Sequence, residues 1–288
     1  MIPTSKIEAW LEEDLGHHDV TNQVPGETRG RLLAKESGVA AGIDAAVAVF
    51  EYLGVGVERG VAAGDSVEPG DGLLRTRGPA RETLRGERVA VNVAGHASGI
   101  ATVTREAVKR AREAATSASE NVSGEAANSA APDSVRIACT RKTTPGLRGV
   151  EKRAVAAAGG DTHRLDLSHM VMVKDNHVAE MGLEGAIEHF RERASFATKI
   201  EVEVEDPADA PRAAEAGADI VLLDNMDPET TAEAVGLLRE SHPDVLAEAS
   251  GGITVEDVSD YAATGVDIIS MGSLTHSADA LDLSFRTG

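Results

Sequence analysis

Residues 199–224 read KIEVEVEDPADAPRAAEAGADIVLLD, and this stretch decides the fold. Isoleucine and valine alternate with charged residues over 199–205, and 219–224 has an apolar centre; both patterns are typical of β-strands. The alanine-rich segment 208–216 between them is typical of an α-helix. Glu203 and Asp224 are 21 residues apart, a separation typical of one strand–helix unit. The stretch therefore predicts two parallel strands joined by a helix.

The same pattern continues on both sides of this stretch. Four further segments resemble strands: 136–140, 170–174, 245–249 and 266–271. Helical patterns lie between several of them, at 149–158, 228–239 and 255–264. Repeated strand–helix units form a parallel sheet or barrel, and a closed barrel of this kind has eight strands. The six strands over residues 135–274 therefore predict a parallel sheet or barrel, with fewer strands than a closed barrel needs.

The first part of the chain has a different pattern. Strand-like runs near 28–35, 55–62 and 72–77 accompany helical patterns at 44–53 and 81–114. We therefore expect a separate α/β domain over residues 1–112. Residues 115–134 are small and polar and have neither a helical nor a strand period. They predict a flexible insertion over residues 113–134.

The composition restricts the partners of the protein. The formal net charge is −20, with 48 acidic and 28 basic residues, which disfavours nucleic acid and anionic membranes as partners. A solvated acidic surface explains this charge, and adaptation to high salt explains it more fully. We find no apolar run of about 20 residues and no signal-peptide pattern. Cys139 is the only cysteine, so a reducing cytoplasm fits the chain.

Positive charge is concentrated in one region of this acidic chain. Residues 140–174 contain seven lysines and arginines and only three acidic residues. Arg148, Lys152 and Arg153 share a helix start and are expected to be ordinary surface charges. Arg141, Lys142 and Lys174 instead end apolar strands, where an unpaired charge is costly. The concentration predicts a ligand with several negative charges, such as phosphates or carboxylates.

Polar residues follow the predicted strands where a parallel barrel carries its active site, at the carboxyl ends. Besides the cations, these positions hold Glu203, Asp224 and two small-residue loops, Ser250-Gly251-Gly252 and Met271-Gly272-Ser273. The backbone N–H groups of such loops can bind phosphate.

Carboxylates predict a metal site in the same region. Glu201, Glu203 and Glu205 alternate with valines, so their side chains share one face of the strand. Glu203 and Asp224 form a pair that can hold Mg²⁺ and leave positions for substrate oxygens. A zinc site is not expected, because one cysteine and scattered histidines lack the spacing. His17-His18-Asp19 is interpreted as a polar loop.

These residues belong to motifs that run almost the length of the chain and resemble the quinolinate phosphoribosyltransferase family. The motifs are Glu13–Gly16, Asp19–Thr21, Glu87–Asn92, Ser98–Thr102, Thr140–Arg148, His163-Arg164, Lys174–His177, Glu201–Glu205, Leu223–Met226, Glu248–Ile253 and Leu274–Ser277. The resemblance implies an N-terminal α/β sandwich domain, an open α/β barrel, and a C-terminal tail, 275–288, that returns to the first domain. It also implies a homodimer with shared active sites, with further assembly left open.

The reaction implied by the resemblance converts quinolinate and phosphoribosyl pyrophosphate into nicotinate mononucleotide, pyrophosphate and CO₂, with Mg²⁺, in NAD biosynthesis. Each predicted site residue receives a role from the same source. Lys142, Glu203 and Asp224 are the implied catalytic residues, and Glu203 and Asp224 also hold the metal. Substrate contacts are implied for Arg88 (from the partner subunit), Thr140, Arg141, Lys142, His163, Arg164, Lys174, Glu203, Asp224, Ser250, Gly251, Gly252, Met271, Gly272 and Ser273.

The chain departs from the family pattern at Ala158, Asp166, His169 and residues 271–273, and Asp166 adds negative charge near the predicted cations. Two alternatives within the class are a molybdenum-associated paralogue and a nicotinate enzyme that does not decarboxylate. Two others are a barrel lyase using Lys174 as a Schiff base and a non-catalytic phosphate-binding barrel. A Schiff-base lysine needs an apolar pocket, whereas carboxylates are expected around Lys174.

Overall fold

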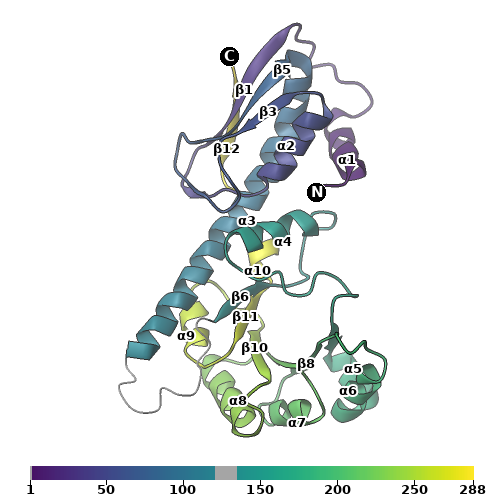
Figure 1. Cartoon of the computed structure of the whole chain (residues 1–288), viewed down its shortest axis with the longest axis vertical. Helices are drawn as coiled ribbons and strands as arrows, with labels where there is room; N and C mark the ends of the chain where they lie inside the picture. The colour runs from purple at the N-terminus through teal and green to yellow at the C-terminus, as the bar shows by residue number, and fades with distance from the viewer. Residues whose placement is uncertain (1, 121–134) are drawn as a thin grey trace. The chain divides into compact units, whose positions relative to one another are not determined.

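The computed structural model describes residues 2–120 and 135–288, which form two compact units (Figure 1). The first unit comprises the described residues of Met1–Arg105 together with Thr144–Gly159 and Ser277–Gly288. The second comprises the described residues of Glu106–Thr143 and Gly160–His276.

A four-stranded antiparallel sheet organises the first unit. Its strand order is β12 (Leu283–Thr287), β1 (Glu27–Ala34), β5 (Gly72–Pro79) and β3 (Gly56–Arg59). Two short strands, β2 (Gly38–Val39) and β4 (Ser66–Val67), form a separate pair. Exposed and buried residues largely alternate along β5, so one face of the sheet is buried.

The core of the first unit lies between this face and two helices. Leu32 and Leu74 on the sheet share one buried cluster with Phe50 of α2 (Ile43–Tyr52) and Ala90 of α3 (Ala80–Glu120). Phe50 also stacks on Phe285 of β12, with ring centroids 5.4 Å apart. The C-terminal tail therefore contributes to the core of the first unit.

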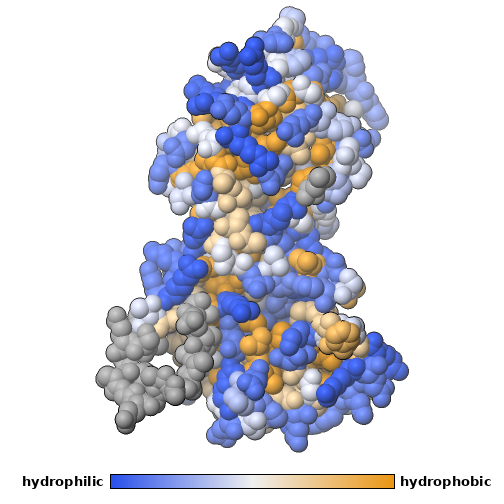
Figure 2. All heavy atoms as spheres, in the orientation of Figure 1, coloured by the Kyte–Doolittle hydropathy of each residue, from blue (hydrophilic) through white to orange (hydrophobic). Residues whose placement is uncertain are grey.

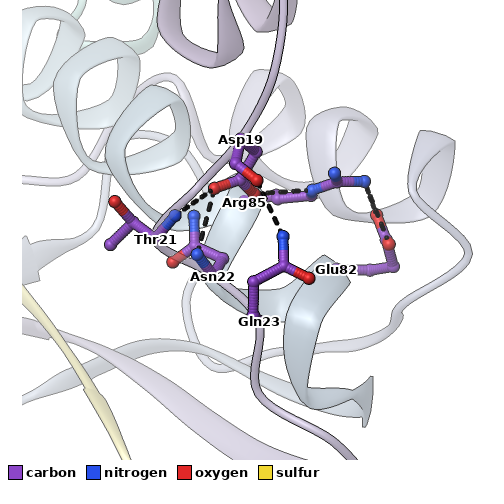
Figure 3. A network of polar contacts seen from close by, with 6 residues as sticks. All are labelled: Asp19, Thr21, Asn22, Gln23, Glu82 and Arg85. Atoms are coloured by element: carbon purple, nitrogen blue, oxygen red, sulfur yellow. Dashed lines mark hydrogen bonds and ion pairs between the residues drawn. The ribbon is translucent and has the colours of Figure 1, made fainter.

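A buried carboxylate fixes the loop that follows α1 (Thr4–Leu15). The Asp19 carboxylate accepts hydrogen bonds from the backbone N–H groups of Thr21 and Asn22, each at 3.0 Å, and pairs with Arg85 Nε at 2.8 Å (Figure 3). The hydrogen bond from Asn22, followed by that from Arg85, holds the pKa of Asp19 well below its usual range. The loop predicted to be polar is thus attached to α3.

Helix α3 is longer than the sequence analysis predicts. It continues from Ala80 to Glu120, so its last turns cover residues that were expected to belong to the insertion. These residues contain no glycine or proline after Arg112 and are rich in alanine, which has the highest helix propensity. The helix leaves the first unit after Arg105. The rest of the predicted insertion, 121–134, lies outside the described residues.

Residues 144–159 also differ from the expected domain boundaries, because they belong to the first unit rather than to the barrel. They include α4 (Arg148–Ala157), whose Glu151 side chain is fully buried. Glu151 lies 2.8 Å from Nε2 of His96 on α3, and Arg105 of α3 donates to the carbonyl oxygen of Ala158. These polar contacts with α3 attach α4 to the first unit.

The second unit contains a six-stranded, entirely parallel sheet. Its order is β6 (Arg136–Cys139), β11 (Ile268–Met271), β10 (Leu246–Ser250), β9 (Ile220–Asp224), β8 (Ile200–Val204) and β7 (Val171–Val173). Strands β6 and β7 form its two edges, so the sheet is open. Together with the sheet of the first unit, this confirms the predicted α/β fold class.

Helices alternate with these strands: α5 (Asp175–Met181), α6 (Leu183–Arg191), α7 (Asp209–Glu215), α8 (Pro228–Ser241), α9 (Val258–Ala262) and α10 (Ser273–His276). The start of α8 follows from its sequence. The Asp227 side chain accepts a hydrogen bond from the N–H of Thr230, and Pro228 occupies the first turn of the helix. No helix within residues 2–120 and 135–288 is both long and apolar enough to cross a membrane. Hydrophilic residues cover much of the face drawn in Figure 2.

Candidate active site

The register of the parallel strands brings the polar side chains of the second unit together. Asp224 on β9 lies opposite Ser250 on β10, which lies opposite Ser270 on β11. Glu203 on β8 lies opposite Leu222, two residues before Asp224. Residues two apart on a strand point to the same face. Glu203, Asp224, Ser250 and Ser270 therefore share one face of the sheet.

This face opens into a cavity of about 680 Å³ within the second unit. Most of the predicted site residues line it: Thr140, Arg141, Lys142, His163, Arg164, Lys174, Glu203, Asp224, Ser250, Gly251, Gly252, Gly272 and Ser273. Residues from both ends of the predicted cationic region and from the predicted carboxylate pair thus contribute to one cavity.

Two predicted residues do not line the cavity. Met271 is only 1% exposed, and it follows Ser270, which does line the cavity. Because strand side chains alternate between faces, the Met271 side chain points into the core instead. Arg88 belongs to the first unit, where it is exposed on α3.

The cavity also has walls that the sequence analysis did not assign to the site. They are Met172, Leu222, Asn225, Glu248, Ile253, Thr254, Ser270 and His276. Glu248 could have been found from the strand period, since it precedes Ser250 by two residues and shares its face. The apolar members Met172, Leu222 and Ile253 carry no chemical signal in the sequence.

An ion pair and a second carboxylate form one side of the cavity. Lys174 Nζ, at the end of β7, lies 2.8 Å from Glu203 Oε2. Burial raises the pKa of Asp224, the nearby negative charge of Glu203 raises it further, and Lys174 opposes the effect. Two carboxylates, Glu203 and Asp224, thus lie near one lysine, Lys174, which favours an additional positive charge at this point.

The turn after β9 holds Asp224 in place. Asn225 has a left-handed backbone, φ 56°, and its Nδ2 donates to Asp224 Oδ2 at 2.6 Å. Gly251 approaches the same turn so closely that a Cβ there would lie 2.6 Å from Asn225 N, and its φ is 105°. A glycine is therefore required at this position, and the Ser250-Gly251-Gly252 loop is fixed beside the carboxylates.

Two arginines form the cationic part of the cavity. Arg164 is 7% exposed, and burial followed by repulsion from Arg141 lowers its pKa. Nε of Arg141 and Nε of Arg164 are buried and have no hydrogen-bond partner among the described residues. Buried donors of this kind are costly without an acceptor. A bound anion with several oxygens would supply one.

His163 extends this cationic region, and two carboxylates contact its ring. Its Nε2 lies 3.1 Å from Glu248 Oε2 and 3.5 Å from Glu201 Oε1, and both glutamates are fully buried. Its backbone is left-handed, φ 47°, and its N–H donates to Asp161 Oδ1 at 2.7 Å. Burial disfavours the charged ring, but Glu201 and Glu248 outweigh it and raise the pKa of His163 to about 10.

His163, Glu201 and Glu248 also have a spacing that could hold a metal ion, with their ligand atoms within 4.8 Å of one another. The protonated His163 ring already supplies the positive charge between the two carboxylates. Burial raises the pKa of Glu201, whereas the neighbouring His163 and Arg164 lower it. The cluster is therefore better described as a buried ion network than as a metal centre.

The two unusual residues of the 163–174 segment lie outside the cavity lining. Asp166 Oδ1 accepts from the backbone N–H and the hydroxyl of Ser168, at 2.9 and 2.6 Å. His169 Nδ1 accepts from the N–H of Leu165 at 3.2 Å. Both side chains thus hydrogen-bond within their own loop.

An open α/β barrel whose cavity joins buried cations to a carboxylate pair defines an enzyme for anionic substrates. Two family models match the chain: the N-terminal domain of quinolinate phosphoribosyl transferase over residues 19–98 and its C-terminal domain over residues 100–286. The chain therefore belongs to the quinolinate phosphoribosyltransferase family, as the motifs predict.

Individual relatives agree with this assignment. The probable nicotinate-nucleotide pyrophosphorylase (carboxylating) of Methanothermobacter thermautotrophicus is 42% identical, covering 97% of this chain and 97% of its own length. The human nicotinate-nucleotide pyrophosphorylase (carboxylating) is 40% identical and covers 97% of this chain and 90% of its own. The solved nicotinate-nucleotide pyrophosphorylase of Francisella tularensis is 28% identical with a TM-score of 0.87, covering 100% and 98% of the two chains.

Proposed function

We propose that this protein is a carboxylating nicotinate-nucleotide pyrophosphorylase, which converts quinolinate and phosphoribosyl pyrophosphate into nicotinate mononucleotide, pyrophosphate and CO₂. The observation that carries the proposal is the cavity itself, where Arg141, His163 and Arg164 line the same space as Glu203 and Asp224. A dicarboxylate needs cationic side chains, and a metal-bound pyrophosphate group needs carboxylates that hold the metal. The reaction therefore requires both in one cavity.

Quinolinate is a dianion, and the cationic wall fits it. Arg141 and Arg164 have buried Nε groups without partners among the described residues, so each can donate to a carboxylate. His163 adds a charged N–H donor beside them. We assign these three residues, together with Lys174, to the binding of the two quinolinate carboxylates.

The phosphoribosyl part of the second substrate fits the glycine loops and the lysine. Ser250, Gly251, Gly252, Gly272 and Ser273 line the cavity, and their backbone N–H groups are suited to the 5′-phosphate. Thr140 and Lys142 line it too, and we assign Lys142 to the pyrophosphate group. Met271 does not line the cavity, so only its backbone N–H could contribute to this phosphate site.

Mg²⁺ is the cofactor that the donor set supports. Glu203 and Asp224 supply carboxylate oxygens on one face of the sheet, and burial, followed by the negative charge of Glu203, raises the pKa of Asp224. When bound, Mg²⁺ would neutralise charge on the departing pyrophosphate. The same carboxylates can stabilise positive charge that develops on the ribose, which is electrostatic catalysis.

Decarboxylation needs little further from the protein. Once the ring nitrogen is bonded to ribose it is cationic, and it stabilises the electron pair left on the adjacent ring carbon when the carboxylate leaves as CO₂. A proton from water then bonds to that carbon in place of the carboxylate. The protein's contribution is to hold the reacting groups in register and to balance their charge. This role suits a cavity made of fixed ion pairs.

Three further features complete the proposal. We propose a homodimer in which the exposed Arg88 serves the site of the partner subunit, and a cytoplasmic location that fits the lone Cys139. We also propose that the net charge of −20 is an adaptation to high salt. Nucleic acids and membranes are not among the proposed partners.

Product analysis with two substrates tests the function. The protein is incubated with phosphoribosyl pyrophosphate, Mg²⁺ and either quinolinate or nicotinate, and nicotinate mononucleotide is measured. Product from quinolinate supports the proposal, whereas product from nicotinate alone supports the non-decarboxylating alternative. Product from neither substrate supports the paralogue or the non-catalytic barrel.

The Schiff-base alternative is tested separately by borohydride trapping. Lys174 is 45% exposed and paired with Glu203, whereas a Schiff-base lysine lies in an apolar pocket. We therefore expect no covalent adduct at Lys174 after reduction in the presence of substrate. An adduct detected by mass spectrometry would favour the lyase.

A further inference from the structure

The Leu274–Ser277 motif has no part in the chemistry described so far, yet it contacts the loop that carries Lys142. Lys142 lies between β6 and α4, in a segment with no helix or strand of its own. A lysine in such a segment needs other contacts to hold its backbone in one place. The inference below rests on the proposed role of Lys142 in the reaction.

Both backbone polar groups of Lys142 are hydrogen-bonded to threonine hydroxyls. Its N–H donates to Thr140 Oγ1 at 3.0 Å, and its carbonyl oxygen accepts from Thr275 Oγ1 at 2.7 Å. Thr275 is 1% exposed and does not line the cavity. It is therefore placed to hold Lys142 without touching substrate.

Gly272 supports the side chain of Lys142. A Cβ at Gly272 would lie 2.8 Å from Lys142 Cδ and 3.3 Å from Thr140 Oγ1. The aliphatic part of Lys142 thus lies directly against the glycine backbone, where a larger residue would displace it. Gly272 also accepts from the N–H of Thr275 at 3.2 Å, so the two contacts belong to one rigid turn.

We infer that Thr275 is a positioning residue that fixes Lys142 for the phosphoribosyl transfer step, with Gly272 as the surface on which the lysine lies. Lys142 sits on a loop, so its orientation depends on these contacts. A displacement of about 1 Å in such a group can cost about 100-fold in rate. The contact also explains why a motif 133 residues from Lys142 in the chain matters for the site.

Steady-state kinetics of matched variants tests this inference. Thr275→Val removes the hydroxyl at nearly constant volume and is expected to lower kcat about 10- to 100-fold. The KM for quinolinate should change little. Thr275→Ser keeps the hydroxyl and should retain most of the activity. Thr264→Val is the control, because the Thr264 hydroxyl donates to the nearby carbonyl oxygen of Tyr261 at 2.7 Å and Thr264 does not line the cavity.

A double-mutant cycle with Lys142→Ala separates positioning from a general structural role. If Thr275 acts through Lys142, Thr275→Val should have almost no further effect on kcat in the Lys142→Ala background. Hydrogen exchange of residues 140–143 gives a readout independent of activity, and it should become faster in Thr275→Val but not in Thr275→Ser.

Three results would overturn the inference: unchanged kcat in Thr275→Val, the same fold-loss in both backgrounds, or unchanged hydrogen exchange. If Thr275→Val does not fold, Thr275→Ala removes the same hydroxyl, and its loss of kcat should likewise vanish in the Lys142→Ala background. A wild-type protein that makes no nicotinate mononucleotide contradicts the proposed function itself, and the inference falls with it.

Discussion

Single residues set the charge of the cavity, and His163 shows how. Two fully buried glutamates lie within 3.5 Å of its ring. They keep the ring protonated where burial alone would favour the neutral form. The ring charge of His163 therefore does not change with pH near neutrality, and it balances buried negative charge beside the two arginines.

The raised pKa of His163 makes a prediction about stability. The folded-state pKa is about 10 against an ordinary value of 6.5, so the stabilisation is fully present below about pH 6.5. It decreases as the pH rises and is lost once the pH passes about 10. We expect His163→Gln to lower the free energy of unfolding at pH 6.5 much more than at pH 10.

Urea unfolding across this pH range measures the effect. His18→Gln, a change at an exposed position on the loop after α1, serves as the control and should follow the wild-type profile. A constant difference between wild type and His163→Gln at every pH would show that His163 is not protonated in the folded protein.

Arg164 carries a prediction about binding. Arg164→Ala should weaken quinolinate binding by about 10- to 150-fold, because a charge-assisted hydrogen bond contributes about 1.5–3 kcal/mol. Calorimetric titration of the folded variant measures this directly. Arg212→Ala on α7, where the arginine side chain is 52% exposed, should bind quinolinate like the wild type. Equal affinity in Arg164→Ala would remove Arg164 from the quinolinate site.

At the scale of elements, small residues on α3 let the C-terminal tail pack against it. The N–H of Leu281 donates to the carbonyl oxygen of Gly95 at 2.9 Å. A Cβ at Gly99 would lie 1.8 Å from the carbonyl oxygen of Asp279. The tail backbone therefore approaches α3 at a distance that only glycine permits at residue 99.

Two glycine substitutions test this contact against ordinary helix propensity. Gly236→Ala in α8, where a Cβ would meet open space, should stabilise the protein by about 0.5–1 kcal/mol. Gly99→Ala should instead destabilise it by about 1–3 kcal/mol, since overpacking outweighs the gain in helix propensity. Thermal unfolding compares the two. A stabilised Gly99→Ala would mean that the tail does not pack on α3.

Features that depend on a short segment of sequence could be predicted, whereas features that depend on contacts between distant residues could not. The strands β8 and β9 were predicted from residues 199–224, because the alternation of Ile and Val with Glu in β8 and the apolar run of β9 lie within the strands themselves. The end of α3 was placed too early, since alanine and serine look like a loop but continue a helix. Glu201 and Glu248 could be placed on a strand face, but their pairing with His163 depends on the loop that positions the histidine. The contact between Thr275 and Lys142 leaves no trace in local sequence.

At the scale of the whole molecule, the proposed dimer predicts complementation between inactive subunits. Arg88 is exposed in the first unit, whereas Lys142 lines the cavity of the second. Arg88→Ala and Lys142→Ala should each be nearly inactive alone. Mixed under conditions that exchange subunits, they should recover part of the activity, because some hybrid sites carry neither change.

Assays of the mixture before and after exchange, followed by mass spectrometry of mixed dimers, measure this recovery. Two Lys142→Ala preparations treated in the same way provide the baseline. Mixed dimers that form without any gain in activity would show that Arg88 does not serve a shared site.

In the proposed reaction, quinolinate is joined to the phosphoribosyl group and then loses CO₂ in one cavity. The most direct measurement is ¹⁴CO₂ release from quinolinate labelled at the carboxyl group next to the ring nitrogen. We expect labelled CO₂ to be released in a one-to-one ratio with nicotinate mononucleotide, and only when phosphoribosyl pyrophosphate is present. Release without phosphoribosyl pyrophosphate, or mononucleotide formation without labelled CO₂, would contradict it.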